Sequence, residues 1–502
     1  FLALSANAFG VIVEKKTLDT GEGELVHYEE TRFGRLTVKK NNGEFTLFED
    51  GVPVYISGNL MMAEEAVHYA LCQVQSPKDI LAVSSVAGIM EEIDKYRPDR
   101  IDYVELDPAL SAAQFRFSLL KEIPGLRVIH QDARAYLDKT TDSYDAIIMN
   151  LPEPETFQVN RFYTDEFFAV AKKRLRPFGV MGFSLKGYDN YLGEPQRQKV
   201  SSLYNTAKRH FSNIVMLPGT KIFFLCTDGI INTDIPEALR QKGIKTGYIS
   251  GYFAGDITKD RREYLAGSID DATPVNTDTD PYMMQVMFAQ WFAEHQTSPV
   301  WFFVCTGIVF ALYFLVITRE EFVLFSTGAT VMGSEVLIIF IFQILFGYIY
   351  LKIGIIVSVF LAGLLPGAFL GRRLSGKTHK VLVLTDMVLV MIMALIVVIL
   401  KIGGQGFPQM LFYCIAFGIS LLCGFQFPVA LSLRGGDNIS AVRTFSADLA
   451  GAAFGAVIIS SVLIPYLGIV QATLGLIVLK TASIMVVRGS HGKDQQAGVP
   501  VR

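Results

Sequence analysis

Acidic side chains close two of the β-strands predicted in the first half of the chain. Glu105 ends the strand "IDYVEL", and Asp132 follows the strand "LRVIHQ". A carboxylate at the end of such a strand can accept hydrogen bonds from both hydroxyls of a ribose, which we expect of Glu105. Asp132 is placed to meet a base edge. The alternative is that these acids cap the next helix, as we expect of Asp107 before Pro108.

The strands that carry these acids alternate with predicted helices. "DILAVS", "IDYVEL", "LRVIHQ", "YDAIIMN" and "VMGFSLK" are predicted strands separated by helical segments. This order predicts an α/β fold with a Rossmann-like, methyltransferase-type parallel sheet, whose ligand lies at the carboxyl ends of the strands. Within residues 14–60, Asn42-Gly43 and Asp50-Gly51 separate short alternating runs and predict a small β-domain of hairpins.

The first half of the chain resembles the spermidine and spermine synthase family, the aminopropyltransferases. The matching motifs are "YEETRFGRLTV", "DGVPVYIS", "YVELDP", "HQDARAYL" and "YDAIIMNLPEPETFQVNRFYTDEFFAVAKKRLRPFGV". The resemblance implies an N-terminal β-domain on a Rossmann-like domain, here residues 61–296. It also implies transfer of an aminopropyl group from decarboxylated S-adenosylmethionine, or a related adenosyl nucleoside, to a diamine. With its apolar second half, the chain resembles the bacterial membrane-fused members of the family.

The turn after the first of these strands departs from the family pattern. The family has three glycines, an aspartate and a glycine, whereas this chain has Ser84, Ser85, Val86, Ala87 and Gly88. Side chains therefore stand where the backbone must approach the ligand closely. The aspartate that meets the cofactor's amine is replaced by alanine, and loss of such a partner costs a buried ion roughly 3 to 5 kcal/mol. The resemblance implies cofactor binding by Ser84, Ser85, Gly88, Glu105 and Asp132.

The positions that the resemblance assigns to catalysis and to the amine differ as well. The family's proton-accepting aspartate falls on Asn150, and an amide cannot take up a proton. Glu153 keeps a carboxylate that can hold a cationic amine. Glu64, His68 and Tyr163 are also expected at the substrate, and the alternative for His68 is a structural histidine. The turn that approaches the cofactor, the acid that pairs with its amine and the base that accepts the proton are thus all altered. We therefore expect the fold to persist and the transferase chemistry to have lapsed.

The composition indicates that part of the chain faces lipid. Hydrophobic residues make up 51% of the 502 residues, and the mean hydropathy is +0.36, more than a soluble globule of this size needs. A net charge of −3 argues against a nucleic-acid binder. The five cysteines have no spacing that suggests a disulfide framework or a zinc site, so we expect no metal.

Seven apolar runs predict an all-α membrane domain of about seven helices over residues 297–488, followed by a polar tail at 489–502. Residues 1–13 are apolar enough to be the end of an upstream helix. Glycines at helix-packing spacing, Gly363, Gly367 and Gly371 in one run and Gly451 with Gly455 in another, indicate close approach of helices. The runs are residues 300–317, 322–350, 353–370, 381–400, 410–433, 445–464 and 467–487.

Two acids, Glu335 and Asp448, fall inside apolar runs. Since an acid near the bilayer centre costs about 2.5 kcal/mol or more, they predict a proton or cation site, with Lys480 or Gln343 as possible partners. The competing interpretation is structural pairing between helices.

Loop charge gives an orientation. If all seven runs cross, nine of the basic residues lie on one face, which should be cytoplasmic, and Lys352 and Lys401 lie on the other. The soluble half would then lie outside the cytoplasm, by resemblance at a bacterial inner membrane. If residues 322–350 instead form a re-entrant pair of helices, they do not cross the membrane, and the soluble half then lies in the cytoplasm. The nine are Arg319, Arg372, Arg373, Lys377, Lys380, Arg434, Arg443, Arg488 and Lys493.

Three functions are compatible with these features. The favoured one is a non-catalytic binding or assembly subunit of a membrane complex. The second is a working transferase at the membrane, with Glu105 and Asp132 on the nucleoside and Glu153 on the amine. The third is an amine-responsive transporter or sensor in which Glu335 and Asp448 respond. The partners expected are membrane lipid, a polyamine or other small amine, and membrane-complex subunits.

Overall fold

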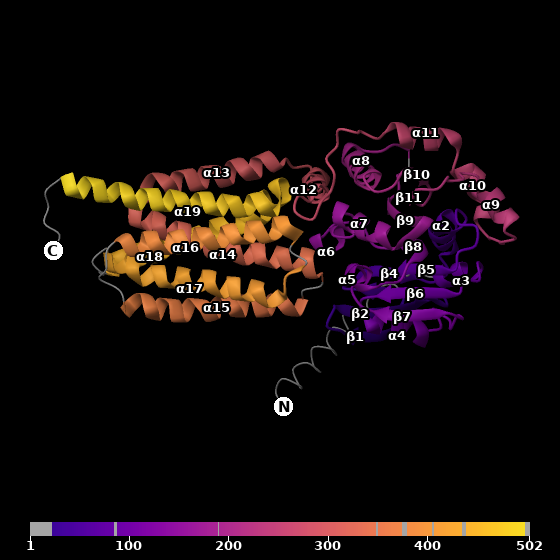
Figure 1. The fold of residues 1–502 in the computed structure, drawn as a ribbon, viewed down its shortest axis with the longest axis horizontal. Helices are drawn as coiled ribbons and strands as arrows, with labels where there is room; N and C mark the ends of the chain where they lie inside the picture. The colour runs from indigo at the N-terminus through magenta and orange to yellow at the C-terminus, as the bar shows by residue number, and fades with distance from the viewer. Residues whose placement is uncertain are drawn as a thin grey trace, which may run out of the picture. The chain divides into compact units, whose positions relative to one another are not determined.

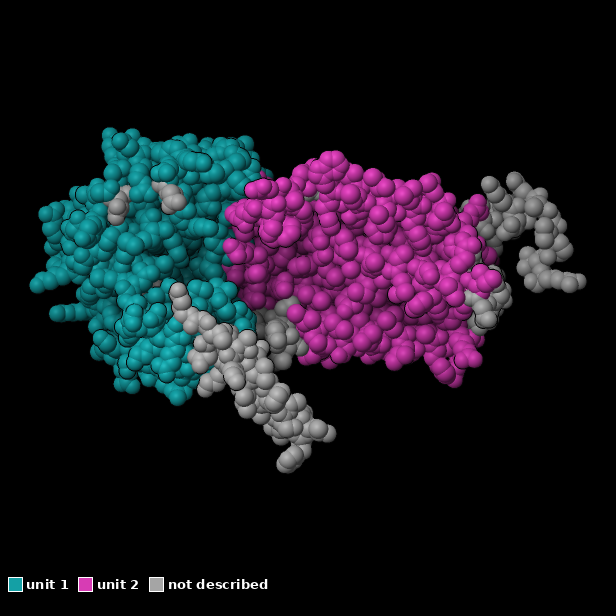
Figure 2. All heavy atoms as spheres, turned by 180° about the vertical axis from the view of Figure 1, so that it is seen from behind, with its two compact units in different colours: residues 1–154, 162–276 teal, residues 155–161, 277–502 magenta. Residues whose placement is uncertain are grey.

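The computed structural model describes residues 23–84, 88–188, 190–347, 350–373, 379–403, 406–433 and 438–496. The chain divides into two compact units, residues 1–154 with 162–276 and residues 155–161 with 277–502 (Figure 2). The second unit therefore begins before the predicted boundary at 297. It includes α12 (Tyr282–Glu294). It also includes the short α6 (Phe157–Asn160), although the residues on both sides of α6 in the sequence belong to the first unit.

The first unit opens with a four-stranded antiparallel sheet in the order β1-β2-β3-β4. Asn42 and Gly43 have φ of 50° and 90°, and Asp50 and Gly51 have φ of 49° and 84°. Two consecutive positive φ values favour tight two-residue hairpin loops, so both turns form where predicted. The strands are β1 (Glu24–Glu30), β2 (Arg35–Asn41), β3 (Glu44–Glu49) and β4 (Val52–Ile56).

The second sheet has seven strands in the order β10-β11-β9-β8-β5-β6-β7. The five predicted strands are confirmed as a parallel set, β5 (Asp79–Val83), β6 (Arg100–Glu105), β7 (Leu126–His130), β8 (Tyr144–Met149) and β9 (Leu175–Lys186). An antiparallel pair, β10 (Asn213–Pro218) and β11 (Lys221–Thr227), extends the sheet and was not predicted.

Helices connect these strands, as the alternation in the sequence requires (Figure 1). The order of the strands reverses at β5, which lies between β6 and β8, so a crevice is expected at the carboxyl ends of these three strands. The helices are α2 (Leu60–Leu71), α3 (Ile89–Asp94), α4 (Pro108–Arg116), α5 (Ala133–Lys139), α7 (Asp165–Arg174), α8 (Glu194–Lys208), α9 (Ile235–Gln241), α10 (Ile249–Asp256) and α11 (Lys259–Gly267).

The second unit is a bundle of long helices. In the described part of the chain, five helical stretches are long and apolar enough to cross a membrane, and a sixth, Val300–Val316, is shorter. The predicted count of about seven is therefore met only in part, because two predicted runs share one stretch, Ala441–Arg488. The helices are α13 (Pro299–Val316), α14 (Arg319–Phe346), α15 (Tyr350–Arg373), α16 (His379–Gly403), α17 (Gln409–Leu433), α18 (Asn438–Ile458), the π-helical turn η2 (Ile459–Leu463) and α19 (Ile464–Gln496).

The last apolar stretch is not one straight helix. Gly468 has φ 80° and ψ 171°, which no α-helix contains, and the π-helical turn lies just before it. Helices α18 and α19 both pack against α14. The stretch of 48 residues therefore folds back at Gly468 (Figure 1).

Glycines allow the bundle helices to approach closely. A Cβ atom added at Gly367 or Gly371 would overlap the backbone of α17, and one added at Gly451 or Gly455 would overlap the backbone of α14. Helices α15 and α17 lie side by side, as do α14 and α18 (Figure 1). The predicted role of these glycines in packing is confirmed, since any side chain would force the helices apart.

Candidate functional site

Glu105 ends β6, and its carboxylate is already satisfied by the protein. One oxygen accepts hydrogen bonds from the N–H groups of Leu106 (2.7 Å) and Asp107 (3.4 Å). The other accepts from the hydroxyls of Tyr103 (3.0 Å) and Ser84 (3.4 Å). A carboxylate offers about four lone-pair positions, and all four are used here. A ribose would have to displace some of these donors before it could bind Glu105.

Ser84 adopts a backbone conformation that favours glycine. Its φ is 57°, in the left-handed region that costs an L-residue about 1 to 2 kcal/mol. The resemblance drawn from the sequence implies a glycine at this position, which would be unstrained and would leave an acceptor position of Glu105 open. Gly88, with φ 82°, ends the same turn and begins α3. Ser85, Val86 and Ala87 lie outside the described residues.

The remaining acids near Glu105 act within the protein. Asp107 accepts from Ala109 N at 2.9 Å and caps α4, as predicted. Asp132 accepts from Ala135 N at 2.9 Å and caps α5, which is the alternative given for the predicted base contact. Burial and the negative charges of Glu105 and Asp107 raise the pKa of Glu49 to about 7. Burial also raises the pKa of Glu105, although the hydrogen bonds oppose it.

Glu153 is bound by a cation that the protein itself supplies. Lys199, on α8, places Nζ 2.8 Å from one Glu153 oxygen, and the backbone N–H of Lys186 donates to the other at 2.7 Å. The Lys199 side chain is 1% exposed and that of Glu153 is 15% exposed. Burial lowers the pKa of a second lysine, Lys221, and the negative charge of Glu153 opposes that shift. The carboxylate predicted to hold a substrate amine thus already holds a lysine amine.

Asn150 lies at the end of β8, beside the end of β5. Its backbone N–H donates to the carbonyl of Val83 at 3.0 Å, and the residue is buried. Tyr163 supports the segment that follows, because its buried hydroxyl donates to the carbonyl of Pro152 at 3.1 Å. The structure therefore brings Asn150, Glu153 and Tyr163 together around one strand end, and the amide of Asn150 cannot take up a proton.

Glu64 and His68 on α2 lie in the protein interior, both fully buried. The Glu64 carboxylate accepts from the N–H groups of Gly247 (2.5 Å), Tyr248 (3.0 Å) and Ile249 (2.9 Å), at the start of α10. It therefore acts as an anchor for that helix.

His68 has a partner on each ring nitrogen. Nε2 lies 2.8 Å from a Glu92 oxygen, and Nδ1 lies 2.9 Å from the Tyr96 hydroxyl. Burial alone would raise the pKa of Glu92, but hydrogen bonds from His68 and Lys95 lower it. These contacts match the structural alternative for this histidine, and its contact with a substrate stays a prediction.

The helical unit contains a buried ion pair that the sequence interpretation missed. Lys480 on α19 lies 2.9 Å from Asp386 on α16, and both side chains are fully buried. Gln426 donates to the same Asp386 oxygen at 2.6 Å, Ser483 donates to the other at 2.8 Å, and Lys480 donates to Thr327 at 2.9 Å. Helices α14, α16, α17 and α19 thus meet at one polar cluster.

The ion pair that Lys480 forms is with Asp386, and its predicted partnership with Glu335 or Asp448 stays a prediction. Glu335 and Asp448 are half-buried, whereas Asp386 is fully buried. The signal was present in the sequence, because Asp386 is the acid of "VLVLTDMVLV" and is as costly there as the two acids that were named. Among the described residues no cluster of His, Cys, Asp and Glu could hold a metal ion.

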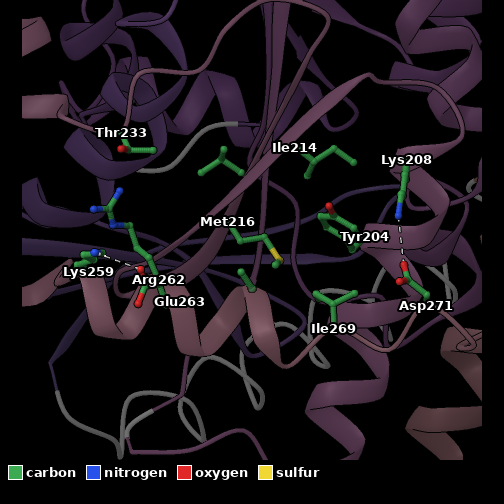
Figure 3. A pocket seen from close by; sticks show the side chains of 12 residues that line it. Tyr204, Lys208, Ile214, Met216, Thr233, Lys259, Arg262, Glu263, Ile269 and Asp271 are labelled. Carbon is green, nitrogen blue, oxygen red and sulfur yellow. Dashed lines mark hydrogen bonds and ion pairs between the residues drawn. The ribbon is translucent and has the colours of Figure 1, made fainter.

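A cavity of 550 Å³ in the first unit lies away from all predicted site residues. It is formed beside β10 by side chains of α8 and α11, and Figure 3 shows Tyr204, Met216 and Arg262 around it. Lys208 and Asp271 on its rim form an ion pair at 3.2 Å. None of the described residues at the ends of β5, β6 or β8 lines it.

Known proteins resemble the first unit. Residues 60–218 match the family described as "Spermine/spermidine synthase domain". The polyamine aminopropyltransferase of Oceanobacillus iheyensis is 29% identical over 167 residues, which is 31% of this chain and 33% of that protein. That of Leptospira interrogans is 26% identical over 168 residues, 32% of this chain and 34% of that protein. The matched part thus spans about a third of these relatives.

Two solved structures also align with part of this chain. A spermidine synthase in complex with the transition-state analogue AdoDATO aligns with a TM-score of 0.42 and 17% identity, over 48% of this chain and 88% of that chain. The spermidine synthase of Thermotoga maritima aligns with a TM-score of 0.40 and 16% identity, over 48% of this chain and 87% of that chain.

Proposed function

We propose that residues 60–218, which match the spermine/spermidine synthase domain family and are joined to apolar, membrane-type helices, no longer transfer aminopropyl groups. This segment serves as a non-catalytic binding or assembly module of an integral membrane protein. The observation that carries this proposal is the internal pairing of Glu153 with Lys199 at 2.8 Å, beside an asparagine at the position of the base.

The amine site supports the proposal in two ways. A primary ammonium that entered beside Glu153 would have to displace Lys199, which is 1% exposed and would be left as a buried charge. Breaking such a pair costs about 3 to 5 kcal/mol, comparable to the whole binding energy of a millimolar ligand. Even a bound amine would meet Asn150, which cannot accept its proton.

The nucleoside site supports it independently. Glu105 has its acceptor positions filled, partly by the hydroxyl of Ser84 at 3.4 Å. The ribose hydroxyls of decarboxylated S-adenosylmethionine would therefore compete with bonds inside the protein. The amine is thus excluded by Lys199 at Glu153, and the nucleoside is excluded by Ser84 and the other donors at Glu105.

Equilibrium binding tests the proposal. Titration of the purified full chain with decarboxylated S-adenosylmethionine should show no saturation below about 1 mM. A dissociation constant of about 10 μM or lower would contradict the proposal, since it requires an open ribose site. The variant Ser84→Gly is the matched comparison, because it removes one competitor for Glu105 and leaves the rest of the crevice unchanged.

The helical unit crosses the membrane seven times in this proposal, with the fold-back at Gly468 separating the last two crossings. Arg319, Lys380 and Arg488 then share one end with the ion pair of Arg443 and Glu321 (2.8 Å). The positive-inside rule makes that end cytoplasmic and the first unit non-cytoplasmic. Protease accessibility of the first unit in sealed vesicles of known orientation tests this, because protection from protease on the periplasmic side would reverse the assignment.

A second candidate function is an amine-responsive transporter or sensor. It is favoured by the Asp386–Lys480 pair, since fully buried charge in an apolar bundle marks functional sites by default. Under this function a diamine would stabilise the wild-type chain, and Glu153→Gln would abolish the effect. Under the assembly function the wild-type chain would not respond, and stoichiometric subunits would co-purify with it.

A further inference from the structure

The basic end of the helical bundle contains a groove between α16 and α19. Its volume is 340 Å³. Lys380 and Arg488 line one part, with His379 beside them, and Val383, Leu384 and Met387 line the rest. Positive charge and apolar surface therefore adjoin each other within a single groove.

The apolar part of the groove faces outward from the bundle. Leu384 is 61% exposed and Met387 is 41% exposed. Both belong to α16, a helix long and apolar enough to cross a membrane. In a bilayer these side chains would contact acyl chains, because water is absent at that depth.

The basic part of the groove has unused charge. Lys380 and Arg488 are both exposed, and neither forms an ion pair with another described residue. Among the described residues that line the groove there is no acid. A smaller pocket shares His379 and Val487 with the groove, and among its described lining residues the acid Glu320 is accompanied by Arg319. The groove is therefore positive at its headgroup end.

We propose that this groove binds one anionic phospholipid. The phosphate lies between Lys380 and Arg488, and an acyl chain lies along Leu384 and Met387. The basic residues supply the charge that a zwitterionic lipid would not complement, and the apolar wall supplies contacts that free phosphate could not make. The lipid ties the ends of α16 and α19, the two helices that also carry Asp386 and Lys480.

Native mass spectrometry of the detergent-purified full chain tests the proposal. With equal concentrations of phosphatidylglycerol and phosphatidylcholine, the wild-type chain should retain one phosphatidylglycerol preferentially. Each basic residue near an anionic lipid contributes about fivefold in affinity, so the double variant Lys380→Gln with Arg488→Gln should bind about thirtyfold more weakly. Lys380→Arg should retain binding.

Lys401 provides the matched control, because it is an exposed lysine at the opposite end of α16. Lys401→Gln should bind phosphatidylglycerol as the wild-type chain does. Equal loss in the control and in the double variant would overturn the proposal, as would unchanged binding in the double variant. Competition by millimolar inorganic phosphate alone would also overturn it, since that result would show an anion site without a lipid requirement. Circular dichroism of each variant shows whether the helices remain folded.

Discussion

Lys199→Met tests whether the protein blocks its own amine site. The substitution keeps an unbranched side chain one atom shorter and removes the ammonium that lies 2.8 Å from Glu153. Removing one partner of a buried pair costs about 3 to 5 kcal/mol. Glu153 keeps its bond to Lys186 N and is 15% exposed, so we expect a loss near the lower limit, about 3 kcal/mol. For a domain of this size that corresponds to a fall of roughly 6 to 12 °C in the melting temperature.

Added diamine should then restore stability to Lys199→Met and not to the wild-type chain. At ten times its dissociation constant a ligand contributes about 1.4 kcal/mol, or roughly 3 to 6 °C. The melt is followed by pulsed hydrogen exchange of peptides from β8 and α8, which reports the first unit alone. The double variant Lys199→Met with Glu153→Gln should regain much of the lost stability and lose the diamine response.

The reasoning is refuted if Lys199→Met melts within about 1 °C of the wild-type chain. Equal stabilisation of both chains by the diamine would refute it too, because Glu153 would then be open to amines without any substitution.

Three further substitutions have defined outcomes. Ser84→Gly relieves left-handed strain of about 1 to 2 kcal/mol, but it adds the entropy cost of glycine and removes the 3.4 Å hydrogen bond to buried Glu105, so its stability in chemical denaturation should stay within about 1 kcal/mol of wild type. Burial and nearby charge raise the pKa of Glu49 from 4.5 to about 7, so its favourable contribution is present below pH 4.5 and lost as the pH rises through 7. Glu49→Gln should therefore be more stable than wild type at pH 8, by at most about 3 kcal/mol, and should lose that part of the pH dependence in melts at pH 5 and 8. Asp386→Asn should lower the melting temperature in detergent by leaving Lys480 buried without its carboxylate, and adding Lys480→Met should recover most of the loss.

The local parts of the fold were predictable from sequence. The hairpins form at Asn42-Gly43 and Asp50-Gly51 because two adjacent residues with positive φ determine the turn by themselves. The parallel strands are mostly apolar runs separated by helices, and that alternation is also local. The pair β10 and β11 was missed, although the runs "NIVMLP" and "KIFFLCT" flank Gly219 and Thr220 at hairpin spacing.

The contacts that decide function were less predictable. Lys199 reaches Glu153 from 46 residues further along the chain, and one lysine on an amphipathic helix carries no signal of its partner. Whether the last acceptor position of the Glu105 carboxylate is occupied depends on the rotamer of Ser84, which the sequence does not specify. Asp386 differs, because an acid within an apolar run is visible in the sequence, and only its partner required the structure.

The most direct test of the lapsed chemistry is an assay of aminopropyl transfer. The full chain in detergent or nanodiscs is incubated with labelled decarboxylated S-adenosylmethionine and a panel of diamines, and labelled polyamine is measured by mass spectrometry. A polyamine aminopropyltransferase of Oceanobacillus iheyensis assayed in parallel provides the positive control. We predict no product above the rate without protein. Product formation that Glu153→Gln abolishes would contradict the account, because it would require both an open amine site and a base that Asn150 does not provide.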